Sequence, residues 1–330
     1  MANISDVAKM AGLSVSTVSR VINNHKYVTE DKRKAVLEAM EALNYQPSVA
    51  ARQLRGQQTR ILGIIVPRIT NPFFSYLVDE VQKMAYANDF QIMIFQSDED
   101  KQKELSFLQL LQKKQIDGVI MCAVENSEEV IRSYSSYGPV ILCNEKFEKS
   151  SLPTVSLNQE YGAYLGIKYL LDKGFKKIAY CTGGLFAEDG KDKERNAGFA
   201  KAMKEYGLKP NTDWLFVDQH TIDDGKHIAQ KISKMKNQPD AIFTGSDEVA
   251  AGFIIESKKI GLVVPEDIAV IGFDDQPLAE LTTPSLTTIK QPIHELGKQT
   301  LEMMFAILEK RTYQVDNKKL VMNLVIRESA

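Results

Sequence analysis

A short polar segment near the N-terminus carries the residue types that hydrogen-bond to nucleic acid. Residues 14–20 read Ser-Val-Ser-Thr-Val-Ser-Arg, so small hydroxyl side chains precede a single arginine. Hydroxyls can donate and accept at base edges and phosphates, and a guanidinium can make two parallel hydrogen bonds to guanine or to a phosphate. The segment therefore indicates DNA contact, with Arg20 reaching either a base or a phosphate.

Two short helices joined by a tight turn would present this segment. Ser5 can cap the first helix, and Gly12 suits the left-handed residue that ends it. Ser14 can cap the second helix, in which Val18 and Ile22 recur at helical spacing and are expected to face inward. This is the helix-turn-helix pattern, whose second helix enters the major groove. The alternative interpretation is a surface helical hairpin without a nucleic-acid role.

The charge distribution supports the first interpretation. Thr29 can cap a third helix that runs to Leu43, which completes a small all-α head. Residues 1–60 carry nine Lys or Arg against five Asp or Glu, whereas the rest of the chain has a net charge of −6. The total of −2 hides this difference. A basic head on a neutral-to-acidic body is typical of a protein that places one end on phosphates.

Several motifs in this order resemble one known family. The resembling residues are Ile4-Ser5-Asp6-Val7-Ala8, Ala11-Gly12-Leu13-Ser14, Thr17-Val18-Ser19-Arg20-Val21-Ile22-Asn23, Leu43-Asn44-Tyr45-Gln46-Pro47 and Ala50-Ala51-Arg52-Gln53-Leu54. In combination they make the chain similar to LacI/GalR-family transcriptional regulators over nearly its whole length. The resemblance implies DNA contacts from a set that comprises Ser5, Ser14, Val15, Ser16, Thr17, Ser19, Arg20, Asn23, Tyr45, Ala51 and Leu54. Val15, Ser16 and Arg20 occupy the base-reading positions, although Val15 could instead pack inward.

The same resemblance divides the chain into three parts. It implies a helix-turn-helix domain over residues 1–46, a hinge helix and linker over 47–60, and an effector-binding and dimerisation core over 61–330. The hinge helix is expected to order on DNA and to insert Leu54 into the minor groove as an apolar wedge. A passive linker is the alternative. The core is expected to place about 61–157 and 290–318 in lobe one, and about 158–289 and 319–330 in lobe two.

Alternating apolar runs and helical patterns define the fold class of the core. Strands are expected at 61–66, 91–96, 119–122, 140–143, 177–181, 214–217, 240–244 and 268–272, with helices near 73–88, 100–114, 127–137, 159–173 and 192–206 between them. This order predicts doubly wound α/β parallel sheets covered on both faces. About 270 residues suit two lobes, like those of periplasmic binding proteins, with a ligand cleft beyond the carboxyl ends of the strands.

Candidate effector contacts follow from these strand ends and from the resemblance. Asn71 can hydrogen-bond a sugar hydroxyl, and Phe73 or Phe74 can stack on a ring face unless both belong to the core. Arg195, Asp247 and Asp274 match family positions that contact effector, and their fork and carboxylate geometry suits vicinal hydroxyls. Asn144 and His220 match more variable positions, and His220 can equally be a surface loop residue. Residues 183–192 are the stretch least similar to the family.

Other functional classes leave no signature in the chain. The loop near Gly184 has the wrong spacing for a phosphate-binding loop, and no dinucleotide fingerprint, nucleophile elbow or metal-ligand spacing of the four histidines is present. We therefore expect no catalytic residue, metal or cofactor. Cys122, Cys143 and Cys181 each end a predicted buried strand, which indicates a reducing cytoplasm. No signal peptide or membrane-spanning run is predicted.

Together these features predict a cytoplasmic, homodimeric repressor. It would bind a near-palindromic double-stranded operator and be released by a sugar or sugar-phosphate inducer between the lobes. One alternative is a corepressor- or partner-protein-dependent regulator of the same fold. Another is a sugar-binding module without DNA activity.

Overall fold

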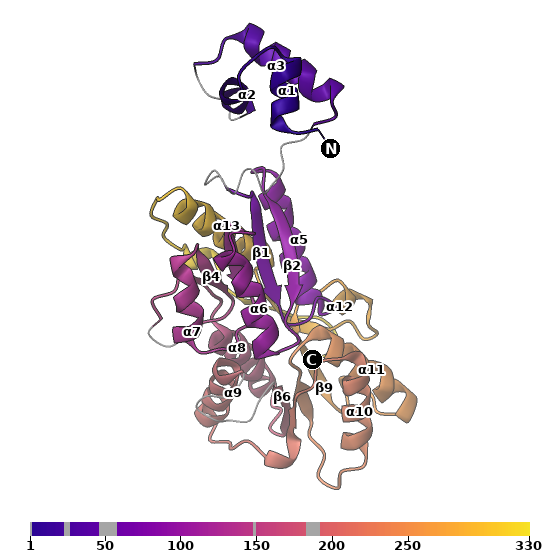
Figure 1. The fold of residues 1–330 in the computed structure, drawn as a ribbon. Helices are drawn as coiled ribbons and strands as arrows, with labels where there is room; N and C mark the ends of the chain where they lie inside the picture. The colour runs from indigo at the N-terminus through magenta and orange to yellow at the C-terminus, as the bar shows by residue number, and fades with distance from the viewer. Residues whose placement is uncertain (1, 23–26, 46–57, 148–149, 183–191) are drawn as a thin grey trace.

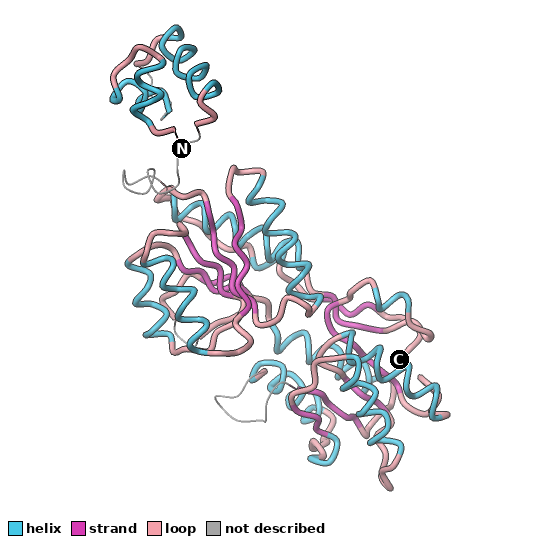
Figure 2. Tube along the Cα trace, turned by 45° about the vertical axis from the view of Figure 1, so that its right-hand side comes forward, coloured by secondary structure: helices cyan, strands magenta, loops and turns pink. Residues whose placement is uncertain are grey.

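The computed structural model describes residues 2–22, 27–45, 58–147, 150–182 and 192–330. Within these residues the chain forms a small helical head and a larger α/β body with two separate sheets (Figures 1 and 2). The predicted hinge helix lies almost wholly outside the described residues, together with Asn23, Ala51 and Leu54. Most of the loop at 183–192, where the family resemblance is weakest, also lies outside them.

Three helices form the head: α1 (Ile4–Met10), α2 (Val15–Ile22) and α3 (Glu30–Ala42). Each helix contributes a fully buried valine to a shared core, namely Val7, Val18 and Val36. Gly12 in the turn before α2 has φ of 65°, the left-handed conformation that glycine adopts without steric cost. The predicted helix-turn-helix is therefore confirmed.

The start of α1 differs from the prediction. Asn3, rather than Ser5, is the N-cap: its Oδ1 accepts hydrogen bonds from the backbone N–H groups of Ser5 at 2.8 Å and Asp6 at 3.2 Å. The Asp6 carboxylate in turn accepts from the Asn3 N–H at 2.9 Å. This reciprocal capping box satisfies two N–H donors at once and moves the start of the helix upstream. In α2, Val21 is buried in addition to the predicted Val18, and Ile22 packs half-buried against the same core.

The first sheet has five parallel strands in the order β2-β1-β3-β4-β5. The strands are β1 (Ile61–Val66), β2 (Gln91–Gln96), β3 (Gly118–Met121), β4 (Val140–Cys143) and β5 (Thr154–Val155). Helices α5 (Pro72–Tyr86) and α13 (Ile293–Leu308) share one core with this sheet, and α6 (Lys101–Gln112) and α7 (Glu128–Ser133), followed by η1 (Tyr134–Ser136), share another. The sheet is thus covered on both faces, as a parallel sheet requires.

The second sheet has six strands in the order β11-β10-β9-β8-β6-β7, with β11 antiparallel to β10. The strands are β6 (Ile178–Thr182), β7 (Leu215–Val217), β8 (Ala241–Phe243), β9 (Ala269–Asp274), β10 (Thr287–Lys290) and β11 (Asn323–Val325). Helices α8 (Gln159–Asp172) and α9 (Lys193–Glu205) pack in one core, and α10 (Ile222–Ser233) and α11 (Asp247–Ile260) in the other. The remaining short helices are α12 (Leu278–Leu281), η2 (Thr212–Trp214) and η3 (Asn317–Lys319).

The chain passes between the two sheets more than once. It leaves the first sheet after β5 and enters α8, which packs on the second sheet. After β10 it returns, because α13 packs on α5, β4 and β5, and β11 then rejoins the second sheet. Side chains at residues 158–159 and 291–292 therefore lie where the chain crosses. Among the described helices, none combines the length and apolar character needed to span a membrane.

Candidate functional site

The outward face of α2 is small, polar and accessible. The Ser14 hydroxyl lies 2.8 Å from the hydroxyls of both Ser16 and Thr17 and accepts from the Thr17 N–H at 3.2 Å, so Ser14 caps the helix as predicted. Ser16 and Arg20 are exposed, and Val15 is 42% exposed rather than packed inward. A surface made of short side chains with one arginine can approach base edges closely.

The other head residues of the predicted DNA-contacting set have different environments. Ser5 is exposed on α1, and Ser19 is half-buried on α2. Tyr45 packs against the head core and closes the backbone after α3 through a 2.8 Å hydrogen bond from its N–H to the Met40 carbonyl. Ser5 and the outward side chains of α2 therefore lie on the surface of the head, whereas Tyr45 is partly buried against its core.

One glutamine joins the two sheets. Gln159, the first residue of α8, donates from Nε2 to Asn144 Oδ1 at 3.0 Å and to Gln291 Oε1 at 3.2 Å. Its Oε1 accepts from Arg195 Nε at 2.9 Å. Asn144 directly follows β4 of the first sheet, whereas Arg195 lies on α9 beside the second. We call Asn144, Gln159, Arg195 and Gln291 the interlobe junction.

Two buried carboxyl groups adjoin this junction at the end of β9. Asp274 Oδ1 accepts from Gln291 at 2.6 Å and its Oδ2 from Gln276 Nε2 at 3.0 Å. Burial raises the pKa of Asp274 to about 7, although Arg195 and the two amide donors oppose the shift. Burial, followed by the nearby Asp274, raises the pKa of Asp247 well above its ordinary value. The pair therefore favours a state with fewer than two negative charges.

Asp247 is wholly enclosed and fully engaged by the protein. Its Oδ1 accepts from the Thr288 hydroxyl at 2.5 Å and its Oδ2 from the Gln276 N–H at 2.7 Å. Asp274 has φ of 116°, a strained conformation for a residue with a side chain, and it is held there by the same amides. Of the two predicted aspartates, Asp274 thus contacts the interlobe junction through Gln291, and Asp247 is connected to Asp274 through Gln276.

Arg195 is fixed on three sides. Beside its bond to Gln159, it donates from Nη1 to the Gly245 carbonyl at 3.0 Å, and its guanidinium lies 3.9 Å from the centre of the Phe273 ring. The contact with an aromatic ring and the hydrogen bond to a carbonyl oxygen together hold the planar guanidinium in one orientation. Such a preset fork is suited to donating to a pair of hydroxyls or to a carboxylate.

The remaining predicted contacts are more dispersed. The side chain of Asn71 caps α5 by accepting from the Phe73 N–H at 3.0 Å. Phe73 is 4% exposed within the core, and its ring packs edge-on against half-buried Phe74 at 5.1 Å between centroids. His220 lies in a loop 2.9 Å from the Asp218 carboxylate. Phe74 is thus the more accessible of the two aromatic rings.

The residues that sequence reasoning missed are amides. Gln159, Gln276 and Gln291 organise the junction, yet none was singled out. A usable signal was present, because Gln159 and Gln291 lie within two residues of the predicted lobe boundaries at 157/158 and 289/290. A polar side chain that is buried where the chain crosses between lobes must be hydrogen-bonded, and its partners can belong to both lobes.

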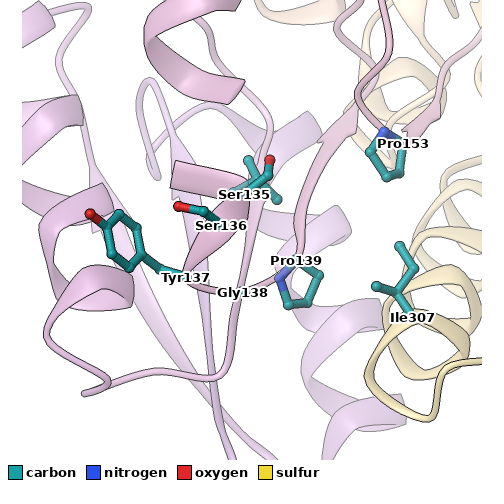
Figure 3. Close-up of a pocket in the computed structure, with 8 residues that line it drawn as sticks. Ser135, Ser136, Tyr137, Gly138, Pro139, Pro153 and Ile307 are labelled. Carbon is teal, nitrogen blue, oxygen red and sulfur yellow. The ribbon is translucent and has the colours of Figure 1, made fainter. Parts of the chain in front are cut away.

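Two surface cavities lie away from the junction. One of about 350 Å³ is lined by Pro139 before β4, Pro153 before β5 and Ile307 of α13, which face a common space in Figure 3. A larger one of about 720 Å³ includes Val264 before β9 and Pro284 before β10. Both therefore lie at amino ends of strands, the opposite edge from the ligand site of open parallel sheets. Among the described residues no group of three His, Cys, Asp or Glu side chains is arranged to hold a metal.

A helix-turn-helix head joined to a two-lobed binding-protein core defines a DNA-binding regulator with an effector-binding domain. The family described as "Bacterial regulatory proteins, lacI family" matches residues 3–48, and a periplasmic binding protein-like domain matches residues 167–330. The chain is 38% identical to the NTD biosynthesis operon regulator NtdR of Bacillus subtilis, over the full length of both. It is 35% identical to the transcriptional repressor PurR of Vibrio parahaemolyticus, with 98% and 99% of the two chains covered. The chain belongs to the LacI family.

Solved structures agree with this assignment. A LacI-family regulator from Lactobacillus casei with bound sucrose has a TM-score of 0.77 and 31% identity, covering 82% of this chain and 99% of its own. The lac repressor dimer bound to operator and the anti-inducer ONPF matches the fold with a TM-score of 0.85 over 99% of this chain and 98% of its own. Its 23% identity supports the fold alone. The predicted fold class and family are thus confirmed.

Proposed function

We propose that this chain is a cytoplasmic, homodimeric repressor that binds a near-palindromic operator and is released by a sugar or sugar phosphate. The observation that carries the proposal is the interlobe junction, in which Gln159 joins Asn144 of one lobe to Arg195 of the other beside the Asp274 carboxyl. A ligand that replaces these polar contacts with its own hydroxyls would alter the relation between the lobes. The Lactobacillus casei relative with bound sucrose or glucose supports a sugar as the ligand class.

The division of labour follows the predicted domains. We assign residues 1–46 to DNA binding, 47–60 to the hinge, and 61–330 to effector binding and dimerisation. Within the core, α13 packing on the first sheet and β11 pairing in the second support lobe one as 61–157 and 290–318, and lobe two as 158–289 and 319–330. Two heads of a dimer would then reach successive major-groove half-sites.

On the DNA side, exposed Val15, Ser16 and Arg20 would face base edges. Ser5, Ser14, Thr17, Ser19 and Tyr45 would contribute backbone contacts or support, while Asn23, Ala51 and the Leu54 wedge complete the set outside the described residues. Arg20 suits a bidentate contact to guanine, and Val15 an apolar contact to a thymine methyl.

On the effector side, Arg195 and Asp274 would bind the ring hydroxyls. Asn144 would contact the sugar from lobe one, with Asn71 and Phe74 at the same edge of that lobe. The enclosed position of Asp247 favours a role in fixing Gln276 and Thr288 rather than direct contact. Phe73 and His220 would support the shape of the site from the core and from a loop.

Coupling between the sites would run through the lobe angle. A bound sugar would reorganise the interlobe junction, change that angle, and move the two hinge segments of the dimer apart. The relatives are named as regulators, which supports a binding role without catalysis, metal or cofactor. A corepressor would use the same coupling with the opposite sign.

A two-stage experiment tests the proposal. Thermal shifts of the full chain with a panel of sugars and sugar phosphates identify the stabilising compound, whose effect on operator affinity is then measured by fluorescence anisotropy. We expect the best compound to lower operator affinity. Raised affinity would identify a corepressor, and stabilisation without any change in operator affinity would contradict the coupling.

A further inference from the structure

Carboxylates from both lobes converge on the space beside the interlobe junction. Glu125 follows β3 and Glu145 follows β4, at the carboxyl edge of the first sheet. Asp192 and Glu194 lie at the start of α9, beside the second sheet. Acidic side chains are thus present on both lobes beside the junction, together with the cations Lys146 and Arg195.

Glu145 is the centre of this group. Burial raises its pKa to about 8, and the largest electrostatic contributions come from the carboxylates of Asp192 and Glu125, with Arg195 acting in the opposite direction. Within the described part of the chain, its carboxyl makes no hydrogen bond or ion pair. A partly enclosed acid without a protein partner costs free energy unless it is protonated or meets a cation from outside.

The nearby protein cations are already engaged. Arg195 is held by Gln159, by the Gly245 carbonyl and by the Phe273 ring. Lys146, next to Glu145, forms an ion pair across the lobes with Glu194. Neither Arg195 nor Lys146 forms an ion pair with Glu145 among the described residues, so its carboxyl can accept from a cationic ligand.

A second, independent feature is a hydrogen-bond acceptor that the described residues leave unused. Gln276 is 3% exposed and its Oε1 has no hydrogen-bond partner among the described residues, while its Nε2 is used by Asp274. Arg195 acts electrostatically on both Asp274 and Glu145, which places the two acids around the same guanidinium. The site thus offers acceptors at Glu145, Asp274 and Gln276, and an ammonium group supplies three donors and no acceptor.

We propose that the effector is an amino sugar whose protonated amine pairs with Glu145, while its hydroxyls bind Arg195 and Asp274. This inference rests on the proposed function and specifies the ligand class within it. A sugar phosphate would bring two negative charges toward an acidic site, whereas an ammonium would favour the ionised form of Glu145 and pair with it. The amine therefore contributes to affinity.

Matched ligands test the inference in the full-length protein. Isothermal titration calorimetry at neutral pH would compare glucose, galactose and mannose, each as the neutral sugar, the 2-amino sugar and the 6-phosphate. We expect one amino sugar to bind at least about tenfold more tightly than its neutral counterpart, as a charged hydrogen bond allows, and its phosphate to bind more weakly still. Tighter binding of a neutral sugar or a phosphate than of its amino counterpart would overturn the inference while leaving the proposed function intact.

Two isosteric variants locate the effect. Glu145→Gln should remove the preference for the amino sugar without weakening the neutral one, and Glu129→Gln, which changes an exposed carboxylate on α7, should leave the preference unchanged. An amino-sugar preference that survives in Glu145→Gln would contradict the assignment of Glu145. Failure of all nine compounds to bind would instead contradict the sugar class on which the inference rests.

Discussion

The recognition helix and the interlobe junction hold their functional side chains in opposite ways. On α2, Ser16 and Arg20 are exposed on one eight-residue helix and depend on few other parts of the chain. In the junction, Gln159, Arg195 and Gln291 come from three distant segments, and Gln159 is hydrogen-bonded to both of the others. A surface that meets a macromolecule can be encoded locally, whereas a small-ligand site is assembled from the whole fold. Loss of Arg195, whose guanidinium has several partners, should therefore cost more than loss of Arg20 on α2.

The largest effect is expected for Arg195→Ala. The change removes the bonds to Gln159 and Gly245 and the cation beside Asp274, so it leaves buried polar groups without partners. Sugar affinity should fall by about 2 to 4 kcal/mol, measured by calorimetry. Operator affinity without sugar should change less than sugar affinity. Arg132→Ala, an exposed arginine on α7, is the matched control, and an equal loss in that variant would contradict the role of Arg195.

Arg20→Ala probes the other side of the comparison. Specific operator binding should weaken by about 1 to 3 kcal/mol and base preference should relax at one position, because the exposed guanidinium has no second role in the head. An operator library read by anisotropy measures both effects, and sugar affinity should stay unchanged. Weaker binding with unaltered selectivity would show that Arg20 contacts a phosphate instead.

The buried Glu145 carboxyl should make the stability of the protein depend on pH. The folded state raises the pKa of Glu145 to about 8, so wild-type stability should decrease as the pH rises from about 4.5 toward 8. Glu145→Gln cannot ionise and should be more stable than the wild type above pH 8 by about 1 to 2 kcal/mol. The difference should vanish below pH 4.5, where both side chains are neutral. Thermal unfolding across this range checks the sign, and a difference independent of pH would contradict it.

The smallest effect is expected for Gln159→Ala. Removal of the hydrogen bonds to Asn144, Gln291 and Arg195 should reduce the sugar-dependent change in operator affinity by about 0.5 to 1.5 kcal/mol, while each separate affinity changes less. Paired titrations with and without sugar measure this coupling. Gln109→Ala on the exposed face of α6 should keep it intact, and unchanged coupling in both variants would exclude the interlobe junction as the connection.

Sequence patterns predicted the regular elements well where burial is continuous. β1 and β4 have the expected bounds, and β3 lies one residue earlier than expected, because apolar runs mark buried parallel strands. β2 also has the expected bounds, although it is an edge strand whose residues are exposed or half-buried. The two-residue strand β5 and the edge strand β11 were not predicted. β10 was not predicted as a strand either. β5 and β11 are short, and they depend on their neighbours β4 and β10, which the tertiary fold brings beside them.

Prediction of the site was uneven for a physical reason. The α2 surface followed from helical periodicity, because the residues that do not pack inward must face out. Arg195 and Asp274 came from the family resemblance, and the structure brings them to the same junction. Gln276 could not be recognised in this way, since a buried amide has no periodic signature and acquires its role only from distant partners. Gln159 could be found only through its place beside the predicted lobe boundary.

Reciprocity between the two sites is the most direct test of the account. In one set of titrations, the operator affinity of the full-length protein is measured with and without the stabilising sugar; in the other, the sugar affinity is measured with and without operator. If the interlobe junction couples the sites, the sugar must weaken operator binding and the operator must weaken sugar binding by the same factor. The central claim would be contradicted if the sugar bound but left operator affinity unchanged, and the operator left sugar affinity unchanged.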